Sequence, residues 1–265
     1  MVAIVGGNGL GLVNSTGATL GQRGQFGAAQ LGRNGDNIYV NAATGNLVLQ
    51  HQDEFLAATG LGQSLIRTYN SQGQFNDDNG DNWKLSLSRS VGNLTGTLNA
   101  EKSTISRVGG DGAITVFIYD RTTQTYRSSD GAGAYDSLSY DSASAQWRWT
   151  SGSTRVTEIY DANNGGRLIG SRDLDGNSLN YAYNASGLLS QIDDSSGGST
   201  VLKYNGNNLS EIETRCTNAQ GVAVSQTRVR YEYDSANRLS KVSTDLTPED
   251  GSIADGKTVW TRYSY

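Results

Sequence analysis

The sequence offers few side chains of the kinds that perform covalent chemistry. Histidine and cysteine each occur once, at His51 and Cys216. One imidazole cannot build a His-Glu-Xaa-Xaa-His zinc site, and one thiol cannot form an internal disulfide or a four-cysteine metal site. A serine triad on His51 would need the nucleophile elbow Gly-Xaa-Ser-Xaa-Gly, which is absent. We therefore predict no catalytic residue, no metal, no cofactor and no enzyme activity.

Two acid-rich loops, residues 76–81 and 173–177, carry oxygen ligands beside a glycine and raise the question of calcium. With the loop glycine at position six, the place of the bidentate glutamate falls on Ser86 and Ala182, which cannot fill it. Ordinary β-turns are the preferred interpretation of both loops.

Aromatic side chains give the remaining candidate site. Trp147 and Trp149 share a face if their segment is a strand, and two indoles on one face can stack on sugars. Packing within a sheet is the alternative interpretation. Paired carboxylates for glycoside hydrolysis stay a further hypothesis, because the chain fold sets their separation and the sequence does not.

Charge and hydropathy exclude two classes of partner. The chain of 265 residues has 21 Lys plus Arg against 26 Asp plus Glu, a formal net charge of −5. It contains no basic run, so we expect no nucleic-acid binding. Its longest apolar stretches fall far short of the roughly 20 residues that cross a bilayer, so we expect no membrane span. The start also lacks the basic and apolar regions of a signal peptide.

The elements that position these residues are predicted to be strands. No segment shows helical periodicity, whereas residues 83–88, 178–183 and 228–233 alternate apolar and polar side chains. The 34 glycines and the abundant Asn, Ser and Asp supply many turns. We predict an all-β protein with a glycine-rich flexible arm over residues 1–36, irregular hairpins over 37–150, and repeated antiparallel hairpins over 151–265.

The last third contains a repeat of a strand, a Tyr-Asp or Tyr-Asn turn, and a second strand led by leucine. Its tyrosines are spaced by 23, 21 and 29 residues, and repeated units of this kind bury their apolar faces against one another. The predicted repeat core is Tyr160, Tyr183, Tyr204, Tyr233, Leu168, Leu189, Leu209 and Leu239. The predicted turn-forming residues are Asp161, Asn184, Asn205 and Asp234.

Residues 231–239 read Tyr-Glu-Tyr-Asp-Ser-Ala-Asn-Arg-Leu, close to Tyr-Xaa-Tyr-Asp-Xaa-Xaa-Gly-Arg-Leu. Three upstream segments, 40–47, 67–71 and 80–83, also match the start of proteins with that motif. Over about residues 36–265 the chain thus resembles the Rhs, or YD-repeat, family. Asn237 replaces the usual glycine, and asparagine also tolerates the left-handed region.

The resemblance implies a spiralling β-sheet shell that, in bacterial Rhs toxins, encloses a carboxy-terminal toxic domain. The Asp-Pro self-cleavage motif of that family is absent, since Pro248 follows Thr247. We expect a non-catalytic shell segment of a secreted or cell-surface toxin, with the rest of the shell, the effector and a delivery component at the amino terminus as partners. The chain stops at Tyr265 within a repeat, and we expect the native protein to continue. The alternative is a cell-surface module that binds carbohydrate or protein.

Overall fold

The structure is a computed structural model that describes residues 3–5, 30–31, 37–41, 45–56, 60–73, 75, 78–128 and 135–265. The all-β prediction is confirmed: the described residues form β-strands, nearly all antiparallel, and two single-turn 3-10 helices. The 3-10 helices are Ala162–Asn164 and Pro248–Asp250. The strands belong to two sheets, described in turn below.

The smaller sheet has six described strands in the order β1-β3-β4-β5-β6, with β2 also paired to β3. β1 runs parallel to β3, and the other pairs are antiparallel. The bounds are β1 (Ala3–Val5), β2 (Gln30–Leu31), β3 (Asn37–Asn41), β4 (Leu47–Leu56), β5 (Gln63–Asn70) and β6 (Trp83–Leu85).

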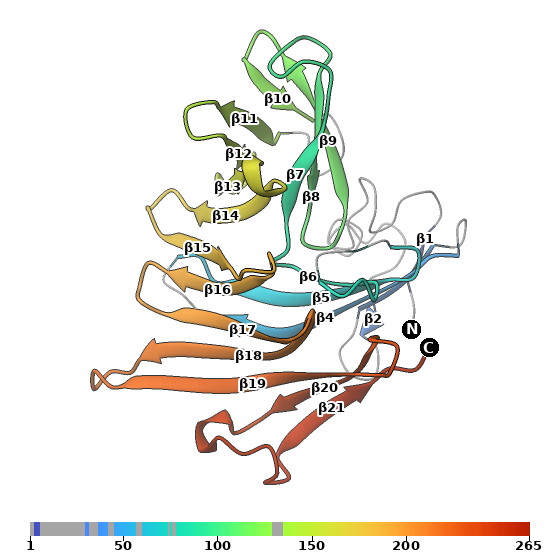
Figure 1. The fold of residues 1–265 in the computed structure, drawn as a ribbon, viewed down its shortest axis with the longest axis vertical. Helices are drawn as coiled ribbons and strands as arrows, with labels where there is room; N and C mark the ends of the chain where they lie inside the picture. The colour runs from blue at the N-terminus through green and yellow to red at the C-terminus, as the bar shows by residue number, and fades with distance from the viewer. Residues whose placement is uncertain are drawn as a thin grey trace.

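The larger sheet has fifteen strands in the order β13-β12-β11-β10-β9-β8-β7-β14-β15-β16-β17-β18-β19-β20-β21. Figure 1 shows β14 to β21 stacked as successive hairpins below the group β7 to β13. The bounds are β7 (Ser90–Thr95), β8 (Thr104–Val108), β9 (Ile114–Asp120), β10 (Thr125–Arg127), β11 (Ser137–Asp141), β12 (Gln146–Thr150), β13 (Thr157–Asp161), β14 (Arg167–Arg172), β15 (Ser178–Tyr183), β16 (Leu189–Asp194), β17 (Ser199–Asn205), β18 (Asn208–Thr217), β19 (Ala223–Tyr233), β20 (Leu239–Asp245) and β21 (Thr258–Arg262).

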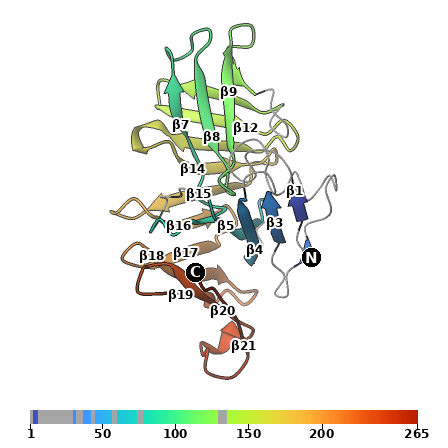
Figure 2. The ribbon, with the colours of Figure 1, turned by 90° about the vertical axis from the view of Figure 1, so that its right-hand side faces the viewer.

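One end of the larger sheet closes on itself. β14 pairs with β13 through five residues and with β7 at Arg167 and Ser90, so β7 to β14 form a closed ring of eight strands. Figure 2 shows these strands gathered at the end of the molecule opposite β21. Closure pairs strand edges that would otherwise stay open to other chains.

Every predicted repeat tyrosine lies at an irregularity of its strand. The pairing register shifts immediately before Tyr160, Tyr183, Tyr204 and Tyr233, each time where the strand meets the leucine-led partner. A β-bulge of this kind bends a strand and increases its twist. Four bulges at equivalent positions therefore give each hairpin the same local bend.

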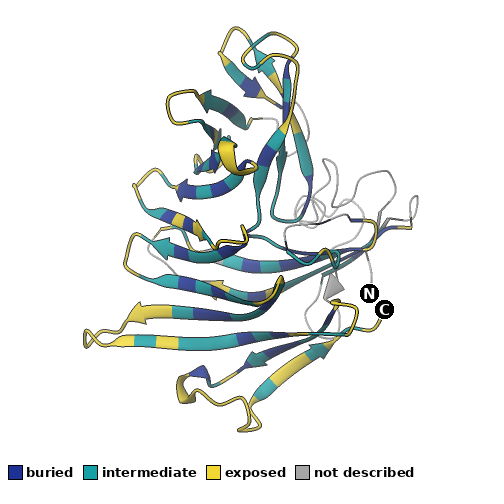
Figure 3. Cartoon of the chain, viewed as in Figure 1, coloured by how far each residue is buried: buried dark blue, intermediate teal, exposed yellow. Residues whose placement is uncertain are grey.

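A single apolar core joins the two sheets. Leu65 and Trp83 of the smaller sheet belong to the same buried cluster as Leu209 and Tyr231 of the larger one. Figure 3 shows buried positions alternating with less buried ones along the hairpin strands, as expected when one face of a sheet is covered. The smaller sheet thus covers the inner face of the hairpins.

The change from one sheet to the other lies within the region expected to form irregular hairpins, residues 37–150. The chain passes from one sheet to the other at residues 86–89, between β6 and β7, and residue 150 lies at the end of β12, within the larger sheet. Residue 150 therefore marks no boundary between sheets. The arm expected over residues 1–36 lies outside the described residues except for β1 and β2.

Candidate functional site: hairpin clamps and buried ionic junctions

The predicted repeat residues lie in or against the core. Tyr160 and the four leucines Leu168, Leu189, Leu209 and Leu239 are buried. Tyr183, Tyr204 and Tyr233 are partly buried and pack against that core. The leucines and tyrosines of successive hairpins therefore contribute to one continuous apolar layer.

A hydrogen bond links each of several hairpins to the one before it. The Tyr183 hydroxyl donates to the Leu168 carbonyl at 2.6 Å, and the Tyr204 hydroxyl donates to the Leu189 carbonyl at 2.9 Å. The Tyr265 hydroxyl donates to the Leu239 carbonyl in the same way, at 2.9 Å. We call this tyrosine-to-leucine contact the hairpin clamp.

Arginine strengthens two of the three clamps. The Arg167 guanidinium lies 4.2 Å from the centre of the Tyr183 ring, and Arg238 lies 4.8 Å from that of Tyr265. A guanidinium over an aromatic face gains about 0.5–2 kcal/mol. The arginine of one repeat thus stacks on the tyrosine whose hydroxyl holds the following leucine.

We expect Tyr204→Phe to lower the free energy of unfolding by about 1 kcal/mol, because the Leu189 carbonyl loses its donor while the ring keeps its packing. Urea denaturation monitored by tryptophan fluorescence measures the change. Tyr135→Phe is the matched control, since Tyr135 is 83% exposed. Equal stability of Tyr204→Phe and wild type would show that the clamp adds nothing.

The predicted turn residues use their side chains to close the hairpins. Asp161 Oδ1 accepts from the Asn163 amide at 3.0 Å. Asn184 and Asp234 each accept from the amides two and four residues ahead, at 2.8–3.0 Å. Asn205 instead flanks a two-residue turn, pairing with Asn208 around Gly206, whose φ of 62° lies in the left-handed region.

A loop before β6 binds the turns of two later hairpins. Asn79 Nδ2 donates to Asn208 Oδ1 at 2.8 Å and to the Asn237 carbonyl at 2.9 Å. Asp81 accepts from the Leu239 amide at 3.0 Å. Asn237 has a φ of 58° and its Oδ1 accepts from Asn208 at 3.2 Å, so its side chain makes a contact that glycine cannot make.

The first buried ionic junction joins the smaller sheet to the hairpins. Arg67 of β5 forms a bidentate pair with Asp53 of β4, both hydrogen bonds measuring 3.0 Å. The side chains of Asp53 and Arg67 are 0% and 3% exposed. Tyr231 donates to Asp53 at 2.7 Å, Arg67 donates to the Tyr263 hydroxyl at 3.0 Å, and the guanidinium lies 4.5 Å from the centre of the Trp83 ring.

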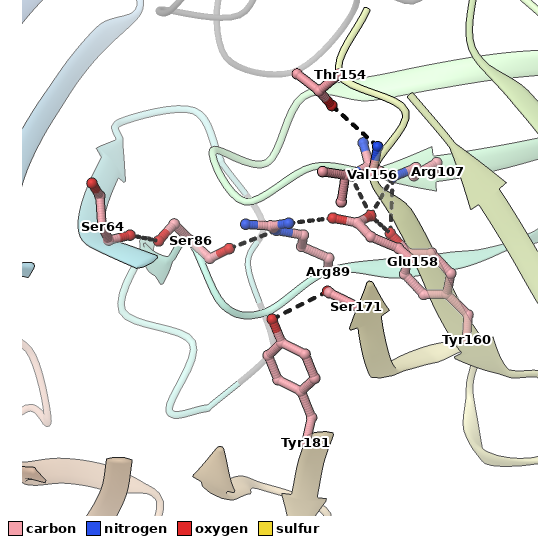
Figure 4. A network of polar contacts seen from close by, with 10 residues as sticks. All are labelled: Ser64, Ser86, Arg89, Arg107, Thr154, Val156, Glu158, Tyr160, Ser171 and Tyr181. Carbon is pink, nitrogen blue, oxygen red and sulfur yellow. Dashed lines mark hydrogen bonds and ion pairs between the residues drawn. The ribbon is translucent and has the colours of Figure 1, made fainter. Parts of the chain in front are cut away.

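The second junction lies within the closed ring (Figure 4). Glu158 of β13, with a side chain 2% exposed, pairs with Arg107 at 2.6 Å and with Arg89. Tyr160 donates to the same carboxylate and accepts from Arg107 Nε at 2.8 Å. Arg89 Nε also donates to the Ser86 carbonyl at 2.8 Å. The carboxylate therefore ties β8 and β13 to the segment that connects the two sheets.

The surroundings of Glu158 favour its ionised form. Burial disfavours the charge, but Arg107, Arg89 and the hydrogen bond from Tyr160 outweigh it and lower the pKa to about 2 from an ordinary value of 4.5. A depressed carboxyl pKa contributes stability that is present above the ordinary value and is lost as pH falls through the folded value.

We therefore expect the stability difference between wild type and Glu158→Gln to be constant above about pH 5 and to shrink by about 3 kcal/mol as pH falls from 4.5 towards 2. Urea denaturation of both proteins at a series of pH values measures this difference. A difference independent of pH over that range would contradict the ionised state of Glu158.

Of the other candidates from the sequence, Trp149 contacts the second junction. Trp147 is 5% exposed and packs edge-on against Tyr126, with ring centres 5.4 Å apart. Trp149 is half-buried under Arg107, whose guanidinium is 4.0 Å from the ring centre. Cys216 is a free, exposed thiol.

Neither a cluster of metal ligands nor a membrane-spanning helix occurs in the described part of the chain. No group of three or more His, Cys, Asp or Glu side chains there is arranged to hold a metal ion. No helix among the described residues is long and apolar enough to cross a membrane.

Sequence reasoning missed the charged members of both junctions. One signal was present for Glu158, because it precedes Tyr160 by two residues in a strand and must face the same core. Asp53 gave no such signal, since the register of β4 shifts between Gln52 and Glu54 and places it inward. Arg67 lies in an alternating strand, but its partner is defined only by the fold.

Comparison with known proteins gives one family match and distant structural similarity. Residues 38–117 match the family described as a domain of unknown function, DUF6531. No curated protein matches the chain. A crystal structure of TcdB2-TccC3-Cdc42 is similar with 12% identity and a TM-score of 0.23, over 79% of this chain and 11% of that one.

A structure of the Tc holotoxin pore of Photorhabdus luminescens with mutated TccC3 is similar with 13% identity and a TM-score of 0.23, over the same shares of the two chains. This chain thus spans about a tenth of the length of the structures it matches. The family match runs from β3 into β9 and includes all three upstream motifs named above.

Proposed function

We propose that this chain is a non-catalytic wall segment of a secreted Rhs-type toxin, which encloses a carboxy-terminal toxic effector and helps to deliver it. The remainder of the same β-sheet shell and the effector are the proposed partners, with a secretion or delivery component at the amino terminus. The protein would act outside the cell or at its surface. Its work would be mechanical enclosure, with no reaction carried out by these residues.

The observation that carries the proposal is the repeated hairpin clamp. Tyr183, Tyr204 and Tyr265 make the same contact with the leucine carbonyl of a preceding hairpin, while the sheet continues from strand to strand. A sheet built from such repeats can be extended one hairpin at a time, because each hairpin is stabilised by contacts with its neighbour. A β-bulge lies at each repeat tyrosine and bends its strand. Strands that bend at equivalent positions suit a curved wall.

The buried junctions support the same proposal. Asp53, Arg67 and Glu158 are buried, and each is paired within its junction: Asp53 with Arg67, and Glu158 with Arg107 and Arg89. Charged networks of this kind fix how two sheets sit against each other. That arrangement suits a rigid enclosure.

Limited proteolysis of the full-length native protein tests the proposal. We expect residues 37–265 and a later effector segment to resist protease together, and both to become sensitive when Glu158→Ala weakens the wall. Glu232→Ala is the matched control, because Glu232 is 59% exposed and pairs only with Lys241 in the described structure. Digestion of everything beyond residue 265 at protease levels that leave 37–265 intact would contradict enclosure.

A glycan array with the same protein separates the proposal from its alternative. We expect no selective glycan binding. Selective binding together with an unprotected carboxy-terminal segment would identify a cell-surface recognition module instead.

A further inference from the structure

A pocket of about 340 Å³ lies at the seam between the two sheets. Its walls come from β6, from the connecting segment before β7, and from the starts of β14 and β16. Basic and hydroxyl side chains line it, namely Lys84, Arg89, Arg167, Ser88, Ser90 and Tyr183. We call it the seam pocket.

The seam pocket is lined by basic side chains in a protein of net charge −5. Its described lining holds three cationic residues and no aspartate or glutamate. Arg89 shares the Glu158 carboxylate with Arg107, and the Asp111 carboxylate also interacts electrostatically with both guanidinium groups. Arg89 therefore has acidic neighbours, whereas Arg167 forms no ion pair among the described residues.

Arg167 supplies the observation that points to a ligand. Its Nε is buried and has no hydrogen-bond partner in the described structure. The guanidinium carbon lies over the Tyr183 ring, 4.2 Å from its centre, while the Arg167 backbone pairs with Ser90 of β7. A buried donor without an acceptor costs about 1–3 kcal/mol. An acceptor that enters the pocket would recover this cost.

We propose that the seam pocket binds an oxyanion, either a carboxylate or a phosphate group, with Arg167 as its main donor. Arginine presents a planar fork of N–H groups that matches both of these anions. Lys84 and Arg89 add positive charge, and the hydroxyls of Ser88 and Ser90 add hydrogen-bonding groups to the lining. The site stands on its own geometry and does not depend on the proposed role as a shell.

Titration calorimetry of the full-length protein with inorganic phosphate, and separately with acetate, tests the site at constant ionic strength, because salt screens exposed charges. We expect saturable binding of at least one anion. Arg167→Gln should weaken it about tenfold, the equivalent of losing one charge-assisted hydrogen bond. Binding of phosphate alone assigns a phosphate source, and binding of acetate alone assigns a carboxylate source.

Arg172→Gln is the matched control, since Arg172 lies on the same strand but is exposed. It should bind the anion as tightly as wild type. Arg167→Lys separates loss of the fork from loss of folding, and we expect it to keep the native melting temperature with weakened binding. Absence of saturable binding of either anion by wild type, or equal weakening by Arg167→Gln and Arg172→Gln, would overturn the proposal.

Discussion

Replacing Glu158 by alanine is expected to lower the free energy of unfolding by about 3–5 kcal/mol, the cost of leaving buried charges without a partner. The substitution removes the one carboxylate that Arg107 and Arg89 share, and it also removes the acceptor of the Tyr160 hydroxyl. The two guanidinium groups then repel each other within the ring. Urea denaturation followed by circular dichroism measures the loss.

The control for this experiment is Glu232→Ala, which breaks an exposed ion pair with Lys241 and should change stability by less than about 1 kcal/mol. A similar small effect of Glu158→Ala would mean that water or another group replaces the carboxylate, and the junction would then have no special role in holding the ring together.

Arg67→Met is expected to destabilise the protein by a similar amount, about 3–5 kcal/mol, because it leaves the fully buried Asp53 without its cation. Methionine keeps much of the side-chain volume beside Trp83, so the effect reports the charge. The double variant Asp53→Leu with Arg67→Met should recover most of the lost stability, since it removes both charges. Thermal and urea unfolding of Arg67→Met, Asp53→Leu and the double variant, each compared with wild type, measure the cycle.

Arg262→Met is the matched control for Arg67→Met. Arg262 also lies over a tryptophan, 4.7 Å from the centre of the Trp260 ring, but it is exposed. We expect it to cost well under 1 kcal/mol. If the double variant is no more stable than Arg67→Met alone, the penalty comes from lost packing and hydrogen bonds to Tyr263, and the buried-charge explanation is wrong.

Local sequence patterns predicted the strand content and the hairpins well, because both depend on near neighbours. The alternation around Tyr181 and Tyr231 follows from the two-residue period of a strand, and the side chains of Asn184 and Asp234 close turns within four residues. These interactions need no knowledge of the rest of the chain.

The features that the sequence did not predict depend on contacts between distant segments. Arg67 is hydrogen-bonded to Tyr263, which lies 196 residues later in the sequence, and Asp53 to Tyr231, which lies 178 residues later. Alternation gives the face of a residue but not the partner that it meets there. The pairing of β14 with β7, which closes the ring, also has no local signal, because Arg167 and Ser90 both sit in ordinary hairpin strands.

Ring closure has a consequence for the order of folding events. β7 completes its hydrogen bonding only after seven further strands have formed and β14 reaches it, so the ring has a large loop-closure entropy. From β14 onward, each strand pairs with the one just before it, and these short-range steps are intrinsically fast. We therefore expect closure of the ring to be slower than the pairing of each later strand with the strand before it.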